Sequence, residues 1–355
     1  TFADRSDRSL TLRPELTAGL ARAYIEHAMA TKEAVTRWWS IGPVFRYEAV
    51  NTGRYRQFYQ IDCEAYGVGE PTLDAELIAM LHALYVRLEI TPITILINNV
   101  GTGDDRARYR VALVEFLTPH ASALCKDCQR RLTTNPLRVL DCKVETCRAI
   151  VADAPSVLDY LGDAARAHFA TVQATLTELG APFVVEPRLV RGLDYYTGTV
   201  FEITTTAGNL GSQSTLVAGG RYDDMIRELG GPVTPAIGFG IGVERTVMCM
   251  PGTPASYAVG LDLFIAAAGP AARVRATALA QALRVAGITV EVEHREVGFK
   301  AQFRRADKLG ARLSLALGES ELATGAAKLK SMAERTETPI ELDGLVAAVR
   351  AALGR

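Results

Sequence analysis

The sequence predicts an α+β domain on a mixed, mainly antiparallel sheet, interrupted by a helical insertion and followed by a separate α/β domain. The chain has 355 residues, more than one hydrophobic core usually serves, so two or three domains are expected. Strand patterns occur on both sides of a helix-rich stretch. Toward the C-terminus, strands and helices alternate regularly, which is typical of a largely parallel sheet.

The first hundred residues predict the order helix, strand, strand, helix, strand. Residues 13–29 form an amphipathic helical pattern, and residues 36–49 and 57–67 are β-rich on either side of a polar loop. Residues 73–88 predict a long helix with an apolar face, and residues 93–101 (ITILINNVG) predict one more strand. These elements would form the first part of the sheet domain.

Changes of pattern give the expected domain boundaries. Residues 1–103 hold the first part of the sheet domain, and residues 104–183, mostly helical and rich in Arg and Asp, form the insertion. Strand patterns return in residues 184–252, which complete an antiparallel sheet. The prolines and small residues of PGTPASYAVG (251–260) predict a linker, so residues 258–355 form the separate α/β domain.

Composition and charge restrict the possible partners. The formal net charge is −1 and the isoelectric point is about 6.5, so nucleic acid could bind only to a local basic patch. No apolar run approaches the roughly 20 residues that cross a bilayer, and TFADRSDRSL at the start resembles no signal peptide. We therefore expect a cytoplasmic protein without membrane partners. Because the first residue is Thr, we also expect a preceding N-terminal piece to be absent.

The cysteines include one cluster. Four of the six occur as CKDC, thirteen residues, then CKVETC, which are Cys125, Cys128, Cys142 and Cys147. This spacing could hold a structural zinc ion. The second pair is wider than a usual zinc knuckle and the residues between are helix-like, which favours reduced thiols instead. Both interpretations stay open, and no other metal site is predicted.

The densest polar signal lies in residues 42–64, GPVFRYEAVNTGRYRQFYQIDCE. Two β-like segments flank a polar loop, which predicts a hairpin. Counting by twos places Arg46 and Glu48 on one strand face, and Arg54 and Arg56 on another. Arginines beside a carboxylate suit a polyanion that carries a polar base, because guanidinium groups bind phosphate oxygens bidentately. The alternative is a solvated surface with ion pairs.

A glycine-rich segment, GFGIGVERTV (238–247), is the second signal. Its glycines follow GxGxG, so it matches neither the dinucleotide fingerprint nor a P-loop. Glycines on a strand would let a flat ligand lie close to the backbone, and Arg245 would stand at the start of the next helix. Tight packing of the chain is the alternative reason for these glycines.

Two further segments place arginine next to glycine. They are LVRGLDYYTGTVFE (189–202), with Arg191, and AGGRYDD (218–224), with Arg221. A ligand can approach the backbone at such positions. The tyrosines that follow Arg191 could instead serve ordinary core packing.

Together, and in this order, these motifs resemble the histidyl-tRNA synthetases, a family of class II aminoacyl-tRNA synthetases. RPELT (13–17) is similar to the family's RPEGT, with Leu16 in place of Gly. GPVFRYE with GRYRQFYQ resembles class II motif 2, RGLDYYTGTVFE and AGGRYDD resemble the two histidine signatures, and GFGIGVERTV resembles motif 3. KAQFRRADKLGA resembles the anticodon-binding domain of this family. Motif 1 would precede residue 1.

The resemblance implies a histidine–tRNA ligase. Such an enzyme joins histidine and ATP to histidyl-adenylate with release of pyrophosphate, then transfers histidine to the 3′ end of tRNA(His). ATP is a substrate, Mg²⁺ accompanies it, and the family implies a homodimer. Two alternatives are a regulatory subunit of histidine biosynthesis that does not aminoacylate, and a zinc-stabilised nucleic-acid-binding protein built around the cysteines.

The resemblance also implies residue roles. Catalysis is implied for Arg191, Arg46 and Arg245. ATP binding is implied for Arg46 at the α-phosphate, Glu48 at the adenine, Arg54 and Arg56 at the β- and γ-phosphates, and Arg245 at the γ-phosphate. Histidine binding is implied for Glu15, Thr17 and Gln60 at the amino group, Glu64 and Tyr196 at the imidazole with Tyr195 beside them, and Arg191 at the carboxylate.

The basic stretch from Arg295 to Arg312 is the candidate for contact with tRNA. The residues expected to bind are Lys300, Arg304 and Arg305, because the stretch carries few acidic residues to neutralise them. The insertion would contact the acceptor end of the tRNA if the chain follows the family.

Overall fold

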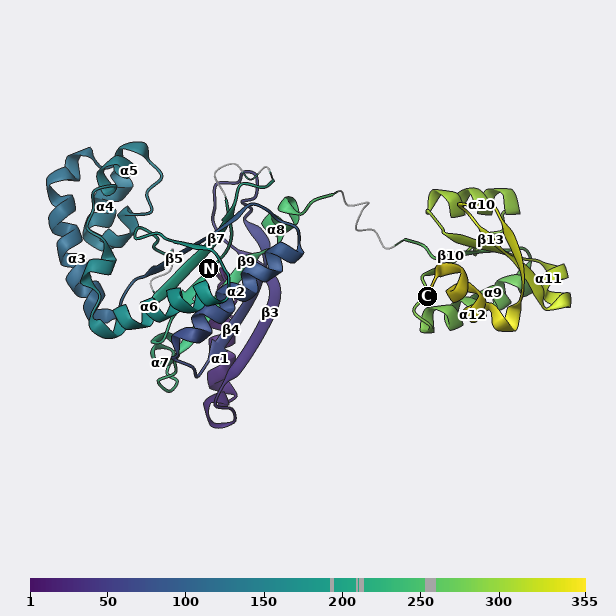
Figure 1. Cartoon of the computed structure of the whole chain (residues 1–355), viewed down its shortest axis with the longest axis horizontal. Coiled ribbons are helices and arrows are strands. Elements are labelled where there is room, and N and C mark those ends of the chain that lie inside the picture. The colour runs from purple at the N-terminus through teal and green to yellow at the C-terminus, as the bar shows by residue number, and fades with distance from the viewer. Residues whose placement is uncertain (192–194, 209, 211–213, 253–259) are drawn as a thin grey trace. The chain divides into compact units, whose positions relative to one another are not determined.

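The computed structural model describes residues 1–191, 195–208, 210, 214–252 and 260–355, so most of the predicted linker lies outside the described residues. The chain divides into two compact units, Thr1–Pro251 and Gly252–Arg355, each of which is described by itself (Figure 1). None of the described helices is long and apolar enough to cross a membrane.

The first unit is built on a seven-stranded sheet in the order β3-β4-β9-β8-β7-β5-β6. All neighbouring strands are antiparallel except β5 and β6, which are parallel. Of the four strands that follow the helical stretch, β7, β8 and β9 insert between β4 and β5 and β6 adds at the edge beside β5, so both halves of the chain form one sheet. This confirms the predicted mixed, mainly antiparallel sheet. The strands are β3 Thr36–Phe45, β4 Gln57–Tyr66, β5 Ile93–Asn99, β6 Phe183–Val185, β7 Thr199–Thr205, β8 Thr215–Arg221 and β9 Ala236–Gly242.

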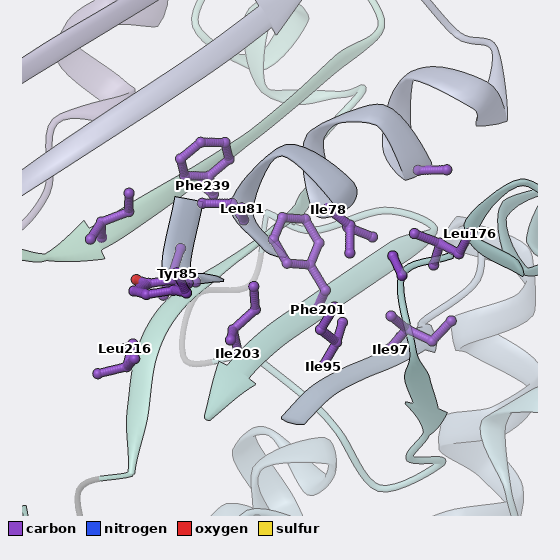
Figure 2. Close-up of a cluster of buried hydrophobic side chains, with 14 of the residues drawn as sticks. Ile78, Leu81, Tyr85, Ile95, Ile97, Leu176, Phe201, Ile203, Leu216 and Phe239 are labelled. Carbon is purple, nitrogen blue, oxygen red and sulfur yellow. The ribbon is translucent and has the colours of Figure 1, made fainter. Parts of the chain in front are cut away.

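One face of this sheet is covered by two long helices, α2 (Pro71–Arg87) and α6 (Asp163–Glu178). Figure 2 shows Ile78 and Leu81 of α2 packed over Phe201 of the sheet. Since side chains alternate along a strand, the apolar residues of β7 and β9 that fill this core leave their neighbours on the opposite face. The opposite face is therefore where polar side chains gather. Although α6 lies in the range 104–183, its buried residues belong to this sheet core.

The first helix is shorter than its pattern predicts. A helix was expected over residues 13–29, but α1 spans Thr17–Glu26. The residues before it bond to the hairpin instead: the carbonyl of Arg13 accepts from the backbone N–H of Phe45 at 2.9 Å. This edge contact brings the RPELT segment to the end of β3. α1 packs with the short helix α7 (Met225–Glu228) around Tyr66.

Residues 103–160, here called the helical module, form a small bundle with its own core. They lie beside the sheet in Figure 1. Thr102 and Asp105 form a capping box that starts the first helix, and the chain then makes two shorter helices separated by 3₁₀ turns. The helices are α3 Gly103–Leu117, α4 Lys126–Thr134 and α5 Glu145–Val151, with η2 Thr118–Ala123, η3 Pro136–Val139 and η4 Val157–Tyr160.

The second unit has a five-stranded sheet in the order β11-β10-β12-β13-β14. The first three strands are parallel, as predicted, but β13 and β14 form an antiparallel hairpin that the sequence analysis missed. Lys328 and Lys330 of β13 alternate with buried Ala327 and Leu329, and so few apolar residues weaken the strand signal. The elements are β10 Leu263–Ala267, α9 Pro270–Val285, β11 Val290–Val292, α10 Phe299–Lys308, β12 Leu313–Leu317, α11 Glu319–Thr324, β13 Ala326–Ser331, β14 Glu337–Glu341 and α12 Leu345–Leu353.

Candidate active site

A polar cavity of about 310 Å³ opens on the sheet face that α2 and α6 leave uncovered. Strands β4, β8 and β9 form its floor, and the hairpin between β3 and β4, the start of α1 and the start of α8 (Val243–Cys249) form its walls. The lining combines arginines and carboxylates, a composition suited to a ligand with both anionic and cationic groups. The charged lining residues are Glu15, Arg46, Glu48, Arg54, Asp62, Asp141, Arg191, Glu202, Glu244 and Arg245.

The floor depends on glycines opposite acidic or polar side chains. Asp62 of β4 lies directly across from Gly240 of β9, and Glu64 lies across from Gly238. A Cβ added at Gly238 would lie 1.6 Å from Oε2 of Glu64, and one at Gly240 would lie 2.9 Å from Oδ1 of Asp62. Both separations are too short for any side chain, so the glycines make the space that the β4 carboxylates occupy. These glycines also line the cavity.

Arg191 enters the cavity from the segment before β7. Its NH1 group forms an ion pair with Glu202 of β7, and its guanidinium carbon lies 5.9 Å from the centre of the Tyr196 ring. The Nε atom of Arg191 is buried, and no described residue accepts a hydrogen bond from it. The hydroxyl of Thr215 donates to the second oxygen of Glu202 at 3.0 Å. Arg191 is therefore fixed in orientation while part of its donor capacity still faces the cavity.

Arg46 follows the last residue of β3 and is fixed by neutral groups. Its Nε donates to the carbonyl of Pro14 at 2.9 Å, and its guanidinium carbon lies 5.1 Å from the centre of the Phe58 ring. Burial lowers the pKa of the Arg46 guanidinium, but an arginine stays protonated at neutral pH. Arg46 is held directly by neutral groups, and the carboxylates of Glu48, Asp62 and Glu15 offset its charge only through space.

The hairpin loop carries two arginines with different surroundings. Arg54 lines the cavity and forms an ion pair with Glu48, which also lines it. Arg56 is absent from the lining; its Nε donates to the carbonyl of Glu48 at 3.2 Å and its guanidinium lies over the Tyr47 ring. The loop turns at Gly53, which has a φ of +70°. The structure thus brings Arg54 to the cavity but keeps Arg56 on the outer side of the hairpin.

Arg245 stands in the first turn of α8 and reaches across to the hairpin. Its Nε donates to the carbonyl of Gly53 at 2.7 Å, and its NH1 donates to the carbonyl of Thr215 at 2.9 Å. Burial and the neighbouring Arg54 and Arg46 lower the pKa of its guanidinium. Two arginines of the hairpin, Arg46 and Arg54, and one of α8 therefore share one end of the cavity.

The other end of the cavity is acidic and rich in hydroxyl groups. Tyr195 donates to Glu15 at 3.2 Å, and its hydroxyl lies 3.5 Å from that of Tyr196. Thr17 donates to Glu64 at 2.6 Å. Glu64 is only 2% exposed and lies just behind the lining rather than in it, and burial raises its pKa well above the ordinary range.

A second cavity of about 560 Å³ adjoins the first. It shares Arg191 and Tyr196 with the polar cavity, and its remaining lining comes mostly from the helical module. Arg106 of α3 donates to the backbone carbonyl of Tyr196 at 2.8 Å, which ties the module to the site. The second cavity is also lined by two further basic residues of the module, Arg110 and Arg138.

Comparison with known proteins agrees with this geometry. A family model described as histidyl-tRNA synthetase matches residues 1–246, and one described as an anticodon binding domain matches residues 262–352. The chain belongs to the histidyl-tRNA synthetase family. It is 47% identical to the histidine–tRNA ligase of Sorangium cellulosum over 96% of this chain and 79% of that protein. It is also 47% identical to that of Syntrophotalea carbinolica, over 97% of this chain and 82% of that protein.

A solved structure gives the same result for the fold. The crystal structure of apo histidyl-tRNA synthetase from S. aureus superposes with a TM-score of 0.80, at 36% identity, and covers 98% of this chain and 85% of that one. The resemblance inferred from the motifs is thereby confirmed, together with the class II fold and its C-terminal anticodon-binding domain.

One departure from the family pattern leaves the cavity unchanged. Leu16, which replaces the glycine of RPEGT, is 4% exposed and is absent from the lining. Its backbone N–H donates to Asp62 at 3.2 Å. The side chain therefore does not narrow the cavity of this histidyl-tRNA synthetase.

Arg221 has a structural role that its neighbouring glycine does not suggest. Its side chain is 2% exposed and donates to Asp74 of α2 at 2.9 Å and to Asp223 at 2.9 Å. Its side chain does not line the cavity, whereas Ala218 and Tyr222 of the same segment do. The ion pair joins α2 to the turn after β8.

Sequence analysis missed several lining residues. Asp62, Glu202 and Glu244 all line the cavity, and Glu244 accepts from the backbone N–H of Tyr59 at 2.9 Å. Asp62 could have been predicted from the alternation of side chains along β4, because it lies between Gln60 and Glu64 on the same strand face. Glu202 was visible as a charged residue on a strand otherwise buried in the core.

The basic stretch of the histidyl-tRNA synthetase anticodon-binding domain is less free than its composition suggests. Lys300 and Arg304 of α10 are exposed. Arg305 pairs with Glu291 at 2.6 Å and with Glu293 at 3.3 Å. Both carboxylates come from β11 and its end, which precede the stretch, so counting acidic residues within it could not reveal them.

The ionisation of Asp62 couples this site to stability. Burial raises the pKa of its carboxyl to about 7, and no described residue bonds to its Oδ1. A carboxyl whose pKa is higher in the folded state than in the unfolded state lowers the free energy of unfolding at any pH where the unfolded chain ionises it. The penalty is absent below the unfolded pKa of about 4, grows with rising pH, and is complete above about 7.

We therefore predict that Asp62→Asn stabilises the first unit at alkaline pH. The difference in unfolding free energy should be small near pH 4 and rise to as much as about 4 kcal/mol at pH 8. Urea unfolding followed by tryptophan fluorescence measures it, since Trp38 and Trp39 both lie in β3. Asp153→Asn, which removes an exposed carboxyl of the same unit, is the control. A flat difference for Asp62→Asn would contradict the raised pKa.

Proposed function

We propose that the polar cavity carries out the reaction of the histidine–tRNA ligases. The enzyme is an ATP-dependent aminoacyl-tRNA ligase, which activates histidine and transfers it to tRNA. The observation that carries the assignment of the site is the meeting of Arg46, Arg191 and Arg245 with the acidic end around Glu15 in one cavity. Such a cavity can hold a triphosphate and an amino acid side by side.

In the first step, an oxygen of the histidine carboxylate attacks the α-phosphorus of ATP. A carboxylate–phosphorus bond forms, the bond to the β-phosphate oxygen breaks, and pyrophosphate leaves with the electron pair. Negative charge builds at the α-phosphate, where Arg191 and Arg46 would donate. Because both guanidinium groups are already fixed by Glu202 and by the Pro14 carbonyl, little reorganisation accompanies the transition state.

The remaining nucleotide contacts follow from the arginine end. Arg54 and Arg245 would hold the β- and γ-phosphates, and Glu48 would accept from the adenine amino group. Arg56 would contribute from the outer side of the hairpin, where it orders the backbone of Glu48. Guanidinium groups suit this role because they bind phosphate oxygens bidentately.

Histidine would occupy the acidic end. Its ammonium group matches Glu15, Thr17 and Gln60, with the missed Asp62 beside them. Ionised Asp62 is favoured by such a cation, which is a reason to keep a buried carboxyl that destabilises the unoccupied fold. The raised pKa thus supports a cationic group of the ligand at this end.

Tyr196 and Glu64 would form hydrogen bonds with the imidazole, and Tyr195 would lie beside them. Glu64 lies behind the lining and is held by Thr17 and Tyr222, so in this conformation it acts mainly by orienting those groups. A pocket of buried polar partners rejects apolar isosteres strongly, because they would leave these groups unpaired.

Mg²⁺ fits this site as a companion of ATP. It prefers carboxylate and phosphate oxygens, and Glu202 lines the cavity close to the arginine end, joined through Thr215 to Arg245. Glu202 would hold the ion together with the phosphates. The ion would offset charge on the leaving pyrophosphate.

The tRNA would contact both units. Lys300, Arg304 and, through its remaining donors, Arg305 would bind phosphates near the anticodon. Arg106 and Arg138 in the second cavity would meet the 3′ end, because that cavity opens on Arg191 and Tyr196, where the adenylate would lie. The regulatory-subunit alternative is disfavoured, since it implies degraded histidine signatures and no C-terminal domain. A cytoplasmic location follows from this role and can be checked by cell fractionation.

We propose a homodimer that pairs through the edge of the sheet at β3. Trp39 is 69% exposed and Ile41 is 53% exposed, on the strand face opposite the cavity. Analytical ultracentrifugation should give a dimer for the parent chain and a monomer for Trp39→Glu with Ile41→Glu. Val111→Glu, at an exposed apolar position on α3, should stay dimeric. Equal masses for all three would refute pairing through β3.

The amino acid specificity is tested by ATP–pyrophosphate exchange with each of the twenty amino acids. Exchange should occur with histidine alone, because its flat ring carries a donor and an acceptor at the positions that Tyr196 and Glu64 would meet. Aminoacylation of tRNA(His) should follow with the same preparation. Absence of exchange with histidine, from protein that is folded by circular dichroism, would refute the proposed function.

Replacement of Arg191 tests the electrostatic contribution. We predict that Arg191→Ala lowers the exchange rate by roughly 10²–10³-fold, since removing one such donor costs about 3–4 kcal/mol of barrier. Arg188→Ala, an exposed arginine paired with Glu186 in the same segment, should exchange normally. Near-normal exchange in Arg191→Ala would exclude the proposed role of this guanidinium.

A further inference from the structure

The four clustered cysteines come together in the helical module, and none of them lines the polar cavity. Cys125 stands at the N-terminus of α4 and Cys128 in its first turn, Cys142 follows η3, and Cys147 lies in α5. Their four sulfur atoms all lie within 4.8 Å of one another. Three sequence segments separated by helices therefore converge at one point.

The sulfur positions match a tetrahedral thiolate site. With zinc–sulfur bonds of about 2.3 Å, the sulfur atoms of a tetrahedron lie about 3.8 Å apart. The sulfur atoms of Cys125 and Cys142 lie 3.9 Å apart. A disulfide would instead bring two sulfurs to about 2.0 Å, and all six cysteines, which lie within the described residues, are free.

The surroundings also suit bound thiolates. The backbone N–H of Cys125 donates to the sulfur of Cys147 at 3.2 Å, the kind of contact that orients a ligand sulfur. Four thiolates around a divalent ion carry a net charge of about −2. Lys126 and Lys143, each directly after a cysteine of the cluster, are exposed and can offset it.

The core of the helical module includes the cysteine cluster. It is built from short helices and turns, and three of its buried residues are cysteines of the cluster. Buried thiols can pack as small apolar groups. Here, however, four of them meet at one point, which places their sulfur atoms to ligate a single ion.

We propose that Cys125, Cys128, Cys142 and Cys147 bind one Zn²⁺ ion as four thiolates. The site is closed by four protein ligands, so the ion is structural rather than catalytic. It joins α4, the turn after η3 and α5 into one unit. The proposal does not depend on the proposed aminoacylation, because it concerns the folding of the helical module.

The ion also bears on the polar cavity through one neighbour. Asp141, which directly precedes Cys142, lines that cavity. Fixing Cys142 on the metal fixes the backbone that presents Asp141. Loss of the ion should therefore loosen one wall of the cavity as well as the module.

Metal analysis of the full chain, expressed with zinc and purified without chelators, is the first measurement. We expect about one zinc per chain, against less than about 0.2 in a Cys142→Ser variant. Cys249→Ser is the matched control: this buried cysteine lies outside the cluster and donates to the carbonyl of Ala207 at 3.2 Å, a bond that serine retains. The control should keep its zinc.

A second measurement uses the parent chain, in case the variant fails to fold. Removing the metal with a chelator under reducing conditions should lower the thermal midpoint, and adding Zn²⁺ alone should restore it. Co²⁺ should give the absorption of a tetrahedral thiolate site. Failure of Zn²⁺ to bind the reduced protein, iron in place of zinc, or two disulfides by mass spectrometry would each overturn the proposal.

Discussion

The active site depends on the register between β4 and β9. Asp62 can stand on the floor of the cavity, and Glu64 just behind it, only because glycine lies directly across from each of them. A shift of β4 by one residue would turn its acidic side chains into the apolar core. One pairing therefore sets the apolar face, the acidic face and the space for a ligand together.

The cationic groups are fixed by a different means. Arg46 and Arg245 are oriented largely by backbone carbonyls and an aromatic ring, which hold a guanidinium without cancelling its charge. Arg191 has a carboxylate partner in Glu202 but keeps a buried donor that no described residue uses. Partial compensation of this kind keeps the fold stable while leaving positive potential for phosphate and carboxylate groups.

The sequence predicts the family, the sheet and six of the ten charged lining residues, because motifs and strand alternation determine which side chains share a face. Arg46, Glu48 and Arg54 follow directly from the hairpin pattern. Other features depend on contacts between distant segments. The late start of α1 results from a backbone bond between Arg13 and Phe45, and the pairing of Arg305 involves a strand outside its own stretch. Likewise, spacing left the cysteines undecided, whereas their convergence needed the three-dimensional structure.

The contact between Arg245 and the carbonyl of Gly53 links the first turn of α8 to the tip of the hairpin. A phosphate that draws this guanidinium toward itself competes with that carbonyl. Nucleotide occupancy and hairpin position are then thermodynamically coupled, and the influence is reciprocal. Substitutions in the hairpin that are remote from any ligand would therefore shift the apparent nucleotide affinity, because they change how easily the hydrogen bond between Arg245 and the Gly53 carbonyl breaks.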